Sequence, residues 1–301
     1  MWRGMIWKPA KTLGLIGGLV IVLAIIGVDL FLLQSARGRG FEVNSYLSVL
    51  LLILSIPLLV LWVYWYYGLL TLHYRLDRDG LVIACGTCSY IVPMGAIEEI
   101  IPGRELKVLQ GFRGIGWPGY LRGRVYVEGL GLVLVHATEP LERQLVVVTD
   151  SLCYGISPRD ETRFLEDFAR RRALGPVRAL PQVVRYARLI ALPVWRDRWF
   201  WAGLILAATA CAALFGLLAS RYGALPERIP IHFDAQGEVD RVGAKQGLLL
   251  IPWIGALTLG VNGLLGVVLH RYERWGARLL AGMSLAIQVV LWVALARILR
   301  G

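Results

Sequence analysis

Three groups of residues have the types and spacing that chemistry requires, and the first is a cysteine pair. Cys85 and Cys88 form a C-x-x-C pattern, which in other settings carries thiol–disulfide exchange or supplies half of a zinc site. A redox pair of this kind begins a helix, and a structural zinc needs two further ligands. This pair spans an expected hairpin turn with no second pair nearby, so we favour a structural role.

The second group is a glycine-rich string at residues 114–119, which spells G-x-G-x-x-G. A dinucleotide fingerprint follows a strand and opens a helix. Here Pro118 lies inside the string, and a further strand is expected after it. We interpret the string as a flexible loop, with Arg113 and Arg122 as candidate contacts for lipid phosphate or a protein partner.

The third group is His232 with the nearby acids Asp234, Glu238 and Asp240. Imidazole and carboxylate groups could hold a metal or sense pH. The acids lack the spacing of a calcium loop, because Gly237 follows Asp234 too early. We favour turn stabilisation and interfacial hydrogen bonds over metal binding. The side chains that we expect to recognise a partner are His232, Phe233, Asp234, Asp240 and Arg241.

The composition indicates which elements position these groups. Of the 301 residues, 57% are hydrophobic and 18% are charged, and the mean hydropathy is +0.61; a soluble domain has about a quarter of its residues charged. These values exclude a disordered chain, a collagen-like fibre and a disulfide scaffold, and argue against an ordinary cytosolic enzyme. The net charge of +11 does not indicate nucleic-acid binding. The arginines cluster at the ends of apolar runs, as topology determinants and contacts with anionic lipid headgroups do.

Five apolar blocks are long enough to cross a bilayer, which takes about 20 residues. They occupy residues 13–33, 47–72, 199–219, 247–269 and 279–296. The basic residues near their ends favour a cytoplasmic N-terminus. We therefore predict a multipass protein of the cell membrane with its C-terminus outside. Gly14 and Gly18 have the spacing of a helix contact, and Asn262 and Gln288 are expected to form hydrogen bonds between helices.

A polar insert at residues 73–172 has the pattern of short strands followed by a helix. Strands are expected at 74–77, 81–85, 89–92, 97–101, 124–128, 132–136, 144–149 and 152–156, on the basis of alternation and turn residues. Ser157 is expected to cap a helix, with Pro158 in its first turn and Asp160 as an early acid. Phe164, Leu165 and Phe168 then fall on one helical face. The pattern predicts an all-β barrel capped by a C-terminal helix.

The insert resembles a bacterial pleckstrin-homology-like (PH-like) domain. The resemblance is carried by Tyr74-Arg75-Leu76-Asp77, Gly80-Leu81-Val82-Ile83, Ile91-Val92-Pro93, Gly116-Trp117-Pro118-Gly119-Tyr120 and Tyr154-Gly155-Ile156-Ser157-Pro158. Domains of this family often lie between membrane spans and serve as binding or assembly modules. The resemblance therefore implies a module without catalytic residues. A phosphoinositide pocket is not expected, because the first hairpin turn is too short to form one.

A second resemblance lies between the third and fourth apolar blocks. The stretch from Leu225 to Arg241, with its Leu-Pro-Glu-Arg-Ile-Pro-Ile-His-Phe-Asp core, is similar to the short domain of unknown function in SdpI-type membrane immunity and signalling proteins. In that family the loop faces outward, which agrees with the orientation predicted above. Pro226 and Pro230 also favour an extended backbone, so we expect an ordered outer cap at residues 220–246.

The linker at residues 173–198 is basic and amphipathic. On a helical wheel, Gln182, Arg185 and Arg188 share one face of the stretch 177–192. A helix lying at the cytoplasmic headgroup layer fits this pattern, and a surface helix packed on the barrel fits it equally. Arg185 and Arg188 are therefore candidate lipid or partner contacts.

These features predict an α-helical membrane protein with five spans and an inserted PH-like barrel. The predicted parts are two helices at 1–72, the PH-like domain at 73–172, the linker at 173–198 and three helices at 199–301. We find no Ser/His/Asp set, carboxylate pair or phosphate-binding loop in the sequence, and therefore predict a non-enzymatic protein with no metal and no cofactor. The expected role is a scaffold, a sensor or SdpI-like immunity, with anionic lipid and a protein as partners. A transporter or transporter accessory subunit is the alternative.

Overall fold

The computed structural model describes residues 4–37, 40–187, 192–233 and 239–299, with residues 230–233 and 239–240 described by their backbone alone. The chain forms two compact units. The first comprises Met1–Gly27 and Pro57–Ile190, and the second comprises Val28–Ile56 and Ala191–Gly301. Each unit is described separately below.

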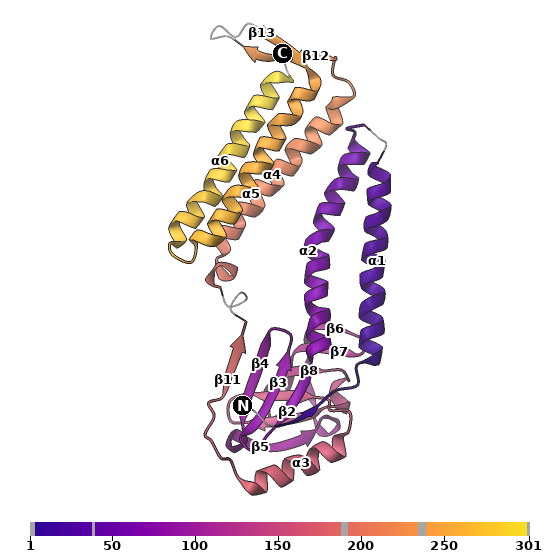
Figure 1. The fold of residues 1–301 in the computed structure, drawn as a ribbon, viewed down its shortest axis with the longest axis vertical. Coiled ribbons are helices and arrows are strands. Elements are labelled where there is room, and N and C mark those ends of the chain that lie inside the picture. The colour runs from indigo at the N-terminus through magenta and orange to yellow at the C-terminus, as the bar shows by residue number, and fades with distance from the viewer. Residues whose placement is uncertain (1–3, 38–39, 188–191, 234–238, 300–301) are drawn as a thin grey trace. The chain divides into compact units, whose positions relative to one another are not determined.

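Five helices of the described chain are long and apolar enough to cross a membrane, which confirms the five predicted spans. They are α1 (Thr12–Ala36), α2 (Val43–Thr71), α4 (Arg198–Tyr222), α5 (Leu250–Leu269) and α6 (Arg274–Ile298) (Figure 1). Each begins and ends within a few residues of a predicted block, because charged, glycine and proline residues flank the apolar runs. The protein is therefore a multipass membrane protein.

The β-rich part of the first unit contains a five-stranded antiparallel sheet. Its strands, in spatial order, are β1 (Met5–Trp7), β2 (His73–Leu76), β3 (Gly80–Cys85), β4 (Cys88–Pro93) and β11 (Val183–Tyr186). The predicted hairpin between β2 and β3 is confirmed, with Leu76 opposite Leu81. β3 and β4 are joined by a two-residue turn in which Gly86 has a positive φ, a conformation that favours glycine.

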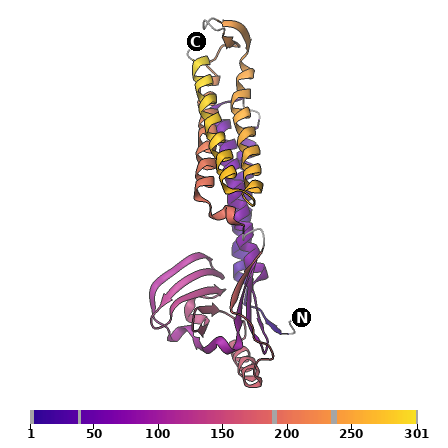
Figure 2. The ribbon, with the colours of Figure 1, turned by 90° about the vertical axis from the view of Figure 1, so that its left-hand side faces the viewer.

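A second, six-stranded sheet follows in the same unit. Its strands, in spatial order, are β5 (Ile97–Pro102), β9 (Leu145–Thr149), β10 (Cys153–Ile156), β8 (Gly131–Ala137), β7 (Tyr120–Val127) and β6 (Val108–Trp117). All neighbours are antiparallel except β8 and β10, which run parallel. Figure 2 shows the curved strands of this sheet, in magenta tones, beside the first sheet.

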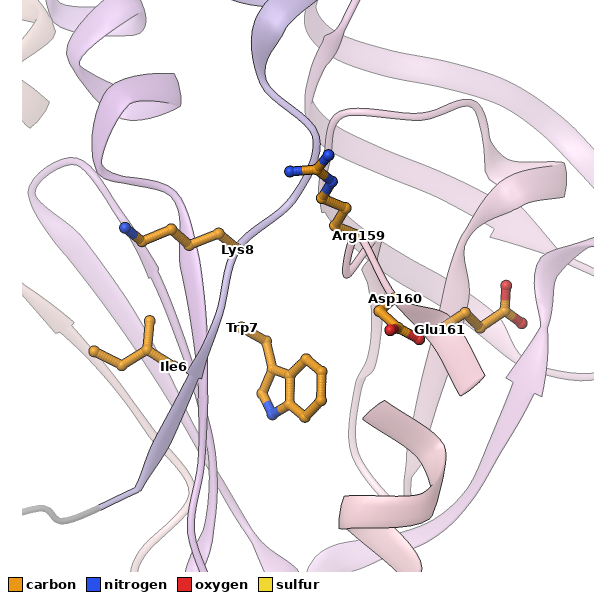
Figure 3. A pocket seen from close by; sticks show the side chains of 6 residues that line it. All are labelled: Ile6, Trp7, Lys8, Arg159, Asp160 and Glu161. Carbon is orange, nitrogen blue, oxygen red and sulfur yellow. The ribbon is translucent and has the colours of Figure 1, made fainter. Parts of the chain in front are cut away.

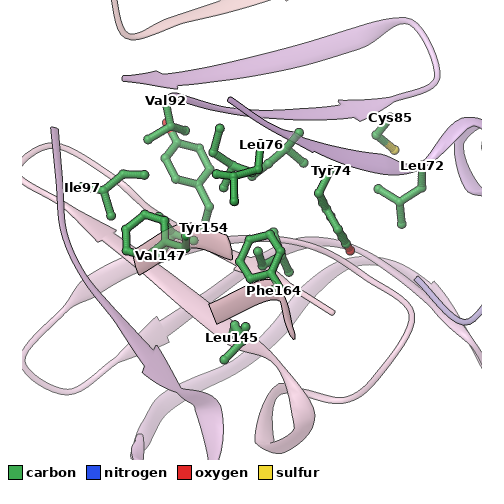
Figure 4. Packing of buried hydrophobic residues seen from close by; sticks show 14 of the residues in the cluster. Leu72, Tyr74, Leu76, Cys85, Val92, Ile97, Leu145, Val147, Tyr154 and Phe164 are labelled. Carbon is green, nitrogen blue, oxygen red and sulfur yellow. The ribbon is translucent and has the colours of Figure 1, made fainter. Parts of the chain in front are cut away.

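One hydrophobic core joins the two sheets and the helix α3 (Glu161–Leu174). Figure 4 shows Tyr74, Tyr154 and Phe164 packed together in this core. The helix begins three residues later than predicted, because Asp160 and not Ser157 is the N-cap; the Asp160 side chain accepts a hydrogen bond from the backbone N–H of Arg163. Phe164 and Phe168 are buried on the predicted face, and α3 therefore covers the core as expected.

Two predictions about the β-rich region require correction, and a third is not confirmed. The strands form two sheets, and closure into a barrel is not confirmed. The predicted flexible loop at 114–119 is wrong in its first part, because residues 114–117 belong to β6 and pair with residues 120–123 of β7. The predicted amphipathic helix at 177–192 is also wrong over residues 183–186. These residues form β11, which satisfies the backbone groups at the edge of β4.

The second unit is built around a bundle of α4, α5 and α6, seen side by side in salmon, orange and yellow in Figure 2. The predicted hydrogen bonds between helices are confirmed. Asn262 Nδ2 donates to Ser284 Oγ at 3.1 Å, and Gln288 Nε2 donates to the carbonyl oxygen of Gly255 at 2.9 Å. Between α4 and α5 the chain forms a hairpin of β12 (Arg228–Phe233) and β13 (Val239–Ala244).

Candidate functional site

The first candidate site is the joint between the β-rich domain and the helices α1 and α2. The indole N–H of Trp117 donates a 2.8 Å hydrogen bond to the carbonyl oxygen of Gly14 near the start of α1. Trp62 of α2 packs against the Trp117 ring, with centroids 4.9 Å apart, and donates to the carbonyl oxygen of Gly18. The predicted contact role of Gly14 and Gly18 is thereby confirmed. The aromatic side chains tie both helices to the domain.

Leu69 and Leu72 extend this joint into the interior of the domain. Both belong to the end of α2 or follow it directly, both are fully buried, and both are part of the same core as the two sheets. The helix therefore ends inside the hydrophobic core of the domain and does not connect to it through a free linker. A displacement of this end of α2 must move the core with it, because protein interiors are close-packed.

The thiols of Cys85 and Cys88 lie beside this joint. Cys85 Sγ is 3.3 Å from the Tyr120 hydroxyl, and Arg122 Nη2 donates to Cys88 Sγ at 3.1 Å. Burial raises the pKa of both thiols, although the Arg122 guanidinium opposes this effect. Neutral thiols are poor nucleophiles, so the arrangement supports a structural role. Arg122 also lies over the ring of Tyr64, at 5.8 Å from its centroid.

His136 is buried in the core of the domain near these groups. Its ring lies 4.5 Å from that of Tyr90, and its carbonyl oxygen accepts a hydrogen bond from the hydroxyl of Tyr74. Burial, assisted by the charge of Arg122, lowers the pKa of His136 to about 3. The ring is therefore neutral near pH 7 and serves in packing, not in proton transfer.

A second candidate site lies in the other unit, where Asp197 immediately precedes α4. Its carboxylate accepts hydrogen bonds from His270 Nε2 and from Arg278 Nε, both at 2.9 Å. It also caps α4 by accepting from the backbone N–H groups of Trp199 and Phe200. The side chains of Asp197 and His270 are 4% and 6% exposed, whereas that of Arg278 is 25% exposed.

The electrostatics of this cluster keep Asp197 ionised. Burial disfavours the charged carboxylate, but the hydrogen bonds from Arg278, His270 and the Phe200 amide outweigh burial and hold the pKa of Asp197 below its usual range. The Nδ1 atom of His270 is buried and has no hydrogen-bond partner among the described residues. The cluster joins the beginning of α4, the residue after α5 and the first turns of α6.

Sequence reasoning missed this cluster because its members lie 73 and 81 positions apart. One available signal was an aspartate directly before an apolar block, where a helix N-cap is expected. A second was the single histidine that follows the fourth block. Neither signal indicates that the two residues meet, since that depends on how the helices pack.

The structure describes the predicted recognition residues only in part. His232 lies in β12, with its backbone opposite Arg241 of β13, and Phe233 lies opposite Val239. Arg241 is exposed. Asp240 belongs to β13, but its side chain and those of His232 and Phe233 are outside the description, as is the whole of Asp234. Their role in recognition stays a prediction.

The predicted basic contacts occupy different places. Arg113 is exposed on β6, opposite Arg124 of β7, whereas Arg122 is half-buried against Cys88. Arg185 is exposed on β11, and Arg188 lies outside the described residues. Of the three described arginines, Arg113 and Arg185 are therefore exposed on different sheets, and Arg122 is half-buried.

A cavity of about 560 Å³ lies where the N-terminal strand meets the start of α3. Figure 3 shows its lining, with Trp7 and Lys8 on one side and Arg159 and Asp160 on the other. The backbone N–H of Arg159 donates to the carbonyl oxygen of Lys8, and the Trp7 ring packs edge-on against Phe164. The lining contains both acidic and basic side chains, but no pair of them is directed at one point of the cavity. The contacts indicate that this region attaches β1 to the start of α3. In the described part of the chain, no three His, Cys, Asp or Glu side chains lie close enough to hold a metal ion.

The fold defines a multipass membrane protein that carries a β-rich PH-like domain between its second and third long helices. A family model described as a bacterial PH domain matches residues 72–172. A second model, described as a domain of unknown function (DUF1648), matches residues 209–256. The second match covers the end of α4, the hairpin of β12 and β13, and the start of α5.

The chain is also similar to an uncharacterized protein from Archaeoglobus fulgidus, with 37% identity over 76 residues. The matched stretch is 24% of this chain and 40% of that relative, so the chain spans less than half of the length of the relative. No solved structure matches the chain.

Proposed function

We propose that the protein is a non-enzymatic scaffold or sensor of the cell membrane, with an SdpI-like immunity or signalling role. Its PH-like domain is the cytoplasmic binding module, and the β12–β13 hairpin is an outer recognition element. The family matches support the presence of both modules. The non-enzymatic role rests on the chemistry of the described side chains, whose thiols and core histidine are held neutral by burial.

The observation that carries this proposal is the joint between the domain and its two helices. Trp117 donates a hydrogen bond to Gly14. Leu69, in the last turn of α2, and Leu72, directly after it, lie within the core of the domain. A catalytic domain can work on a flexible tether, but a sensor must transmit displacement between membrane and module. A shared, close-packed core can do so.

The orientation belongs to the same proposal. More basic residues flank the helix ends that would face the cytoplasm when the N-terminus is inside. Reporter fusions after Arg172 and after Gly243 should therefore report opposite sides, with the first cytoplasmic. Equal signals from both fusions would contradict the proposed topology.

The recognition role is tested by affinity capture of the full chain from mildly solubilised membranes. The matched sample carries Asp234→Ala and Asp240→Ala together. A protein captured with the wild type and lost with the double variant is the expected result, because these acids are the polar groups of the proposed outer contact. The same set of proteins with both chains would contradict recognition by the hairpin.

A transporter or transporter accessory subunit is the second candidate, and the Asp197 cluster is the observation that favours it. Buried ionisable groups associated with membrane helices often mark ion pathways, and Asp197 and His270 directly adjoin the ends of α4 and α5. Proteoliposomes with an internal pH-sensitive dye test this candidate directly. Proton flux that is lost in Asp197→Asn and His270→Gln would support transport, whereas an absence of flux in the wild type would contradict it.

A further inference from the structure

The outer face of the five-stranded sheet has a cleft between two arginines. The cleft has a volume of about 270 Å³ and is lined by His73 and Arg75 of β2, Val82 and Ala84 of β3, Ser89 and Ile91 of β4, and Arg185 of β11. The strand register explains this lining. His73 is opposite Ala84, Ala84 is opposite Ser89, and Ser89 is opposite Arg185. These four residues therefore form one row across the sheet, on the face away from the core.

The middle of this row is small, and Arg185 of β11 stands at one end of it. Arg75 of β2 lies in the neighbouring row on the same face, opposite Val82, so the two arginines stand diagonally across the space that Ala84 and Ser89 leave over β3 and β4. Three strand spacings, about 14 Å in total, separate β2 from β11. Two arginine side chains leaning over the small central residues can therefore approach one anion between them. The Ser89 hydroxyl lies in the floor as a further donor.

The two arginines are free to bind an anion. Within the described residues neither Arg75 nor Arg185 has an ion pair or a side-chain hydrogen bond, and no carboxylate lines the cleft. Asp77, the next acid along β2, hydrogen-bonds the Arg78 amide and faces Arg171 at 4.0 Å. An anion would therefore meet uncompensated positive charge here.

The cleft lies at the end of the domain that adjoins α2. His73 follows the last residue of that helix by two positions. The β3–β4 turn lies beside the same helix, because the Thr87 hydroxyl is 2.9 Å from the Tyr64 hydroxyl and Gly86 packs against Gly68. Tyr64 belongs to an aromatic cluster, residues 62–67, of the kind that lies at headgroup level. We therefore expect the row from His73 to Arg185 to lie near the level of the lipid headgroups.

We propose that this cleft binds the phosphate of an anionic phospholipid headgroup, held by Arg75 and Arg185. The inference rests on the proposed membrane-anchored module and adds a lipid ligand to it. Guanidinium groups suit this ligand, because they form paired hydrogen bonds to phosphate oxygens. The position beside α2 favours a lipid over a soluble phosphate. A lipid bound here would contact the strand that follows α2 and the strand of the linker at once.

Native mass spectrometry of the full chain in detergent tests the site, with phosphatidylglycerol and phosphatidylcholine as probes. The wild type should retain phosphatidylglycerol in preference to phosphatidylcholine. Replacing both arginines, Arg75→Gln with Arg185→Gln, should weaken phosphatidylglycerol binding by about 30-fold, since each basic group near a membrane contributes about fivefold. Arg75→Lys with Arg185→Lys should retain most of the binding, because the charge remains.

The matched control is Arg163→Gln, which removes an exposed arginine of α3 in the same domain and should leave lipid binding unchanged. If the double glutamine variant does not fold, Ser89→Asp places a negative charge in the floor and should also weaken binding.

Unchanged binding in the folded variants, or equal retention of the two lipids, would overturn the proposal. Displacement of the lipid by millimolar inorganic phosphate would also overturn it and identify a soluble anion as the ligand. The lipid experiment contains no partner of the outer hairpin. A negative result here would therefore leave the proposed recognition role untouched.

Discussion

The indole N–H of Trp117 reaches the carbonyl oxygen of Gly14 across 103 positions of the chain, with a hydrogen bond of 2.8 Å. The residue that makes this approach possible is Gly119, which turns the chain after Trp117 with a φ of +84° and contacts Gly14 directly. Residues other than glycine rarely adopt that backbone φ angle. The turn between β6 and β7 therefore brings its backbone against α1, and the joint depends on two glycines as much as on the tryptophan.

Gly14→Ala is expected to weaken this joint. A Cβ at position 14 would lie 2.3 Å from the carbonyl oxygen of Gly119, so backbone must shift, at a cost of about 1 to 3 kcal/mol. The thermal midpoint of the full chain in detergent should fall by several degrees. Gly27→Ala in the same helix is the control, because nothing lies within 4 Å of an added Cβ there. Equal midpoints for the two variants would show that the joint is not tightly packed.

Phe164→Ala should destabilise the β-rich domain by about 3 to 5 kcal/mol, and Phe168→Ala by a similar amount or somewhat less. Both rings are buried on the face of α3 that covers the core, at 0% and 7% exposure. Phe112→Ala is the control, because that ring is 38% exposed on β6. Denaturant unfolding followed by the β signal in circular dichroism measures the change. A loss at Phe112 that matched the loss at Phe164 would contradict the assigned core.

The burial of neutral His136 predicts a pH-dependent stability. The pKa of this group is about 6.5 in an unfolded chain and about 3 in the fold, so the unfolded state binds the additional proton between these values. Stability should therefore fall as the pH decreases from 6.5 to 3, by about 3 to 5 kcal/mol in total from this group. Unfolding of the wild type and of His136→Phe should be compared across that range.

In His136→Phe the dependence on pH should be smaller, because the titrating group is gone. Tyr90→Phe is the matched control, since it retains the ring that packs on His136 and leaves the histidine in place. Its pH dependence should follow that of the wild type. An unchanged slope in His136→Phe would mean that folding does not lower the pKa of this histidine.

The outer hairpin is expected to work without a metal. Chelators should leave the thermal midpoint and any captured partner unchanged, because the acids near His232 lack the spacing of a calcium loop. Elemental analysis of the purified full chain measures this directly. A stoichiometric metal that disappears in His232→Ala would contradict the expectation and would reopen an enzymatic role.

Much of this architecture was predictable because its signals are local. An unbroken apolar run of 20 or more residues has few alternatives to a membrane helix, and all five such runs are helices. The existence of α3 was equally predictable from the buried face shared by Phe164 and Phe168, although its N-cap is Asp160 and not Ser157 as expected. Asn262 and Gln288 were predictable as partners because isolated amides within a bilayer require hydrogen bonds.

Other features were decided only by the tertiary structure. Residues 183–186 have a helical pattern in isolation but pair with β4, because an open sheet edge offers backbone partners that no local sequence reveals. The glycine-rich stretch 114–117 is a strand for the same reason, with β7 as its partner. Asp197, His270 and Arg278 meet because three helices pack at one end. Arg75 and Arg185 line one cleft because the registers of the β2–β3 and β3–β4 hairpins and the pairing of β11 with β4 place them on the same face of the sheet. Local preferences determine elements, whereas sites made from distant residues depend on packing and register.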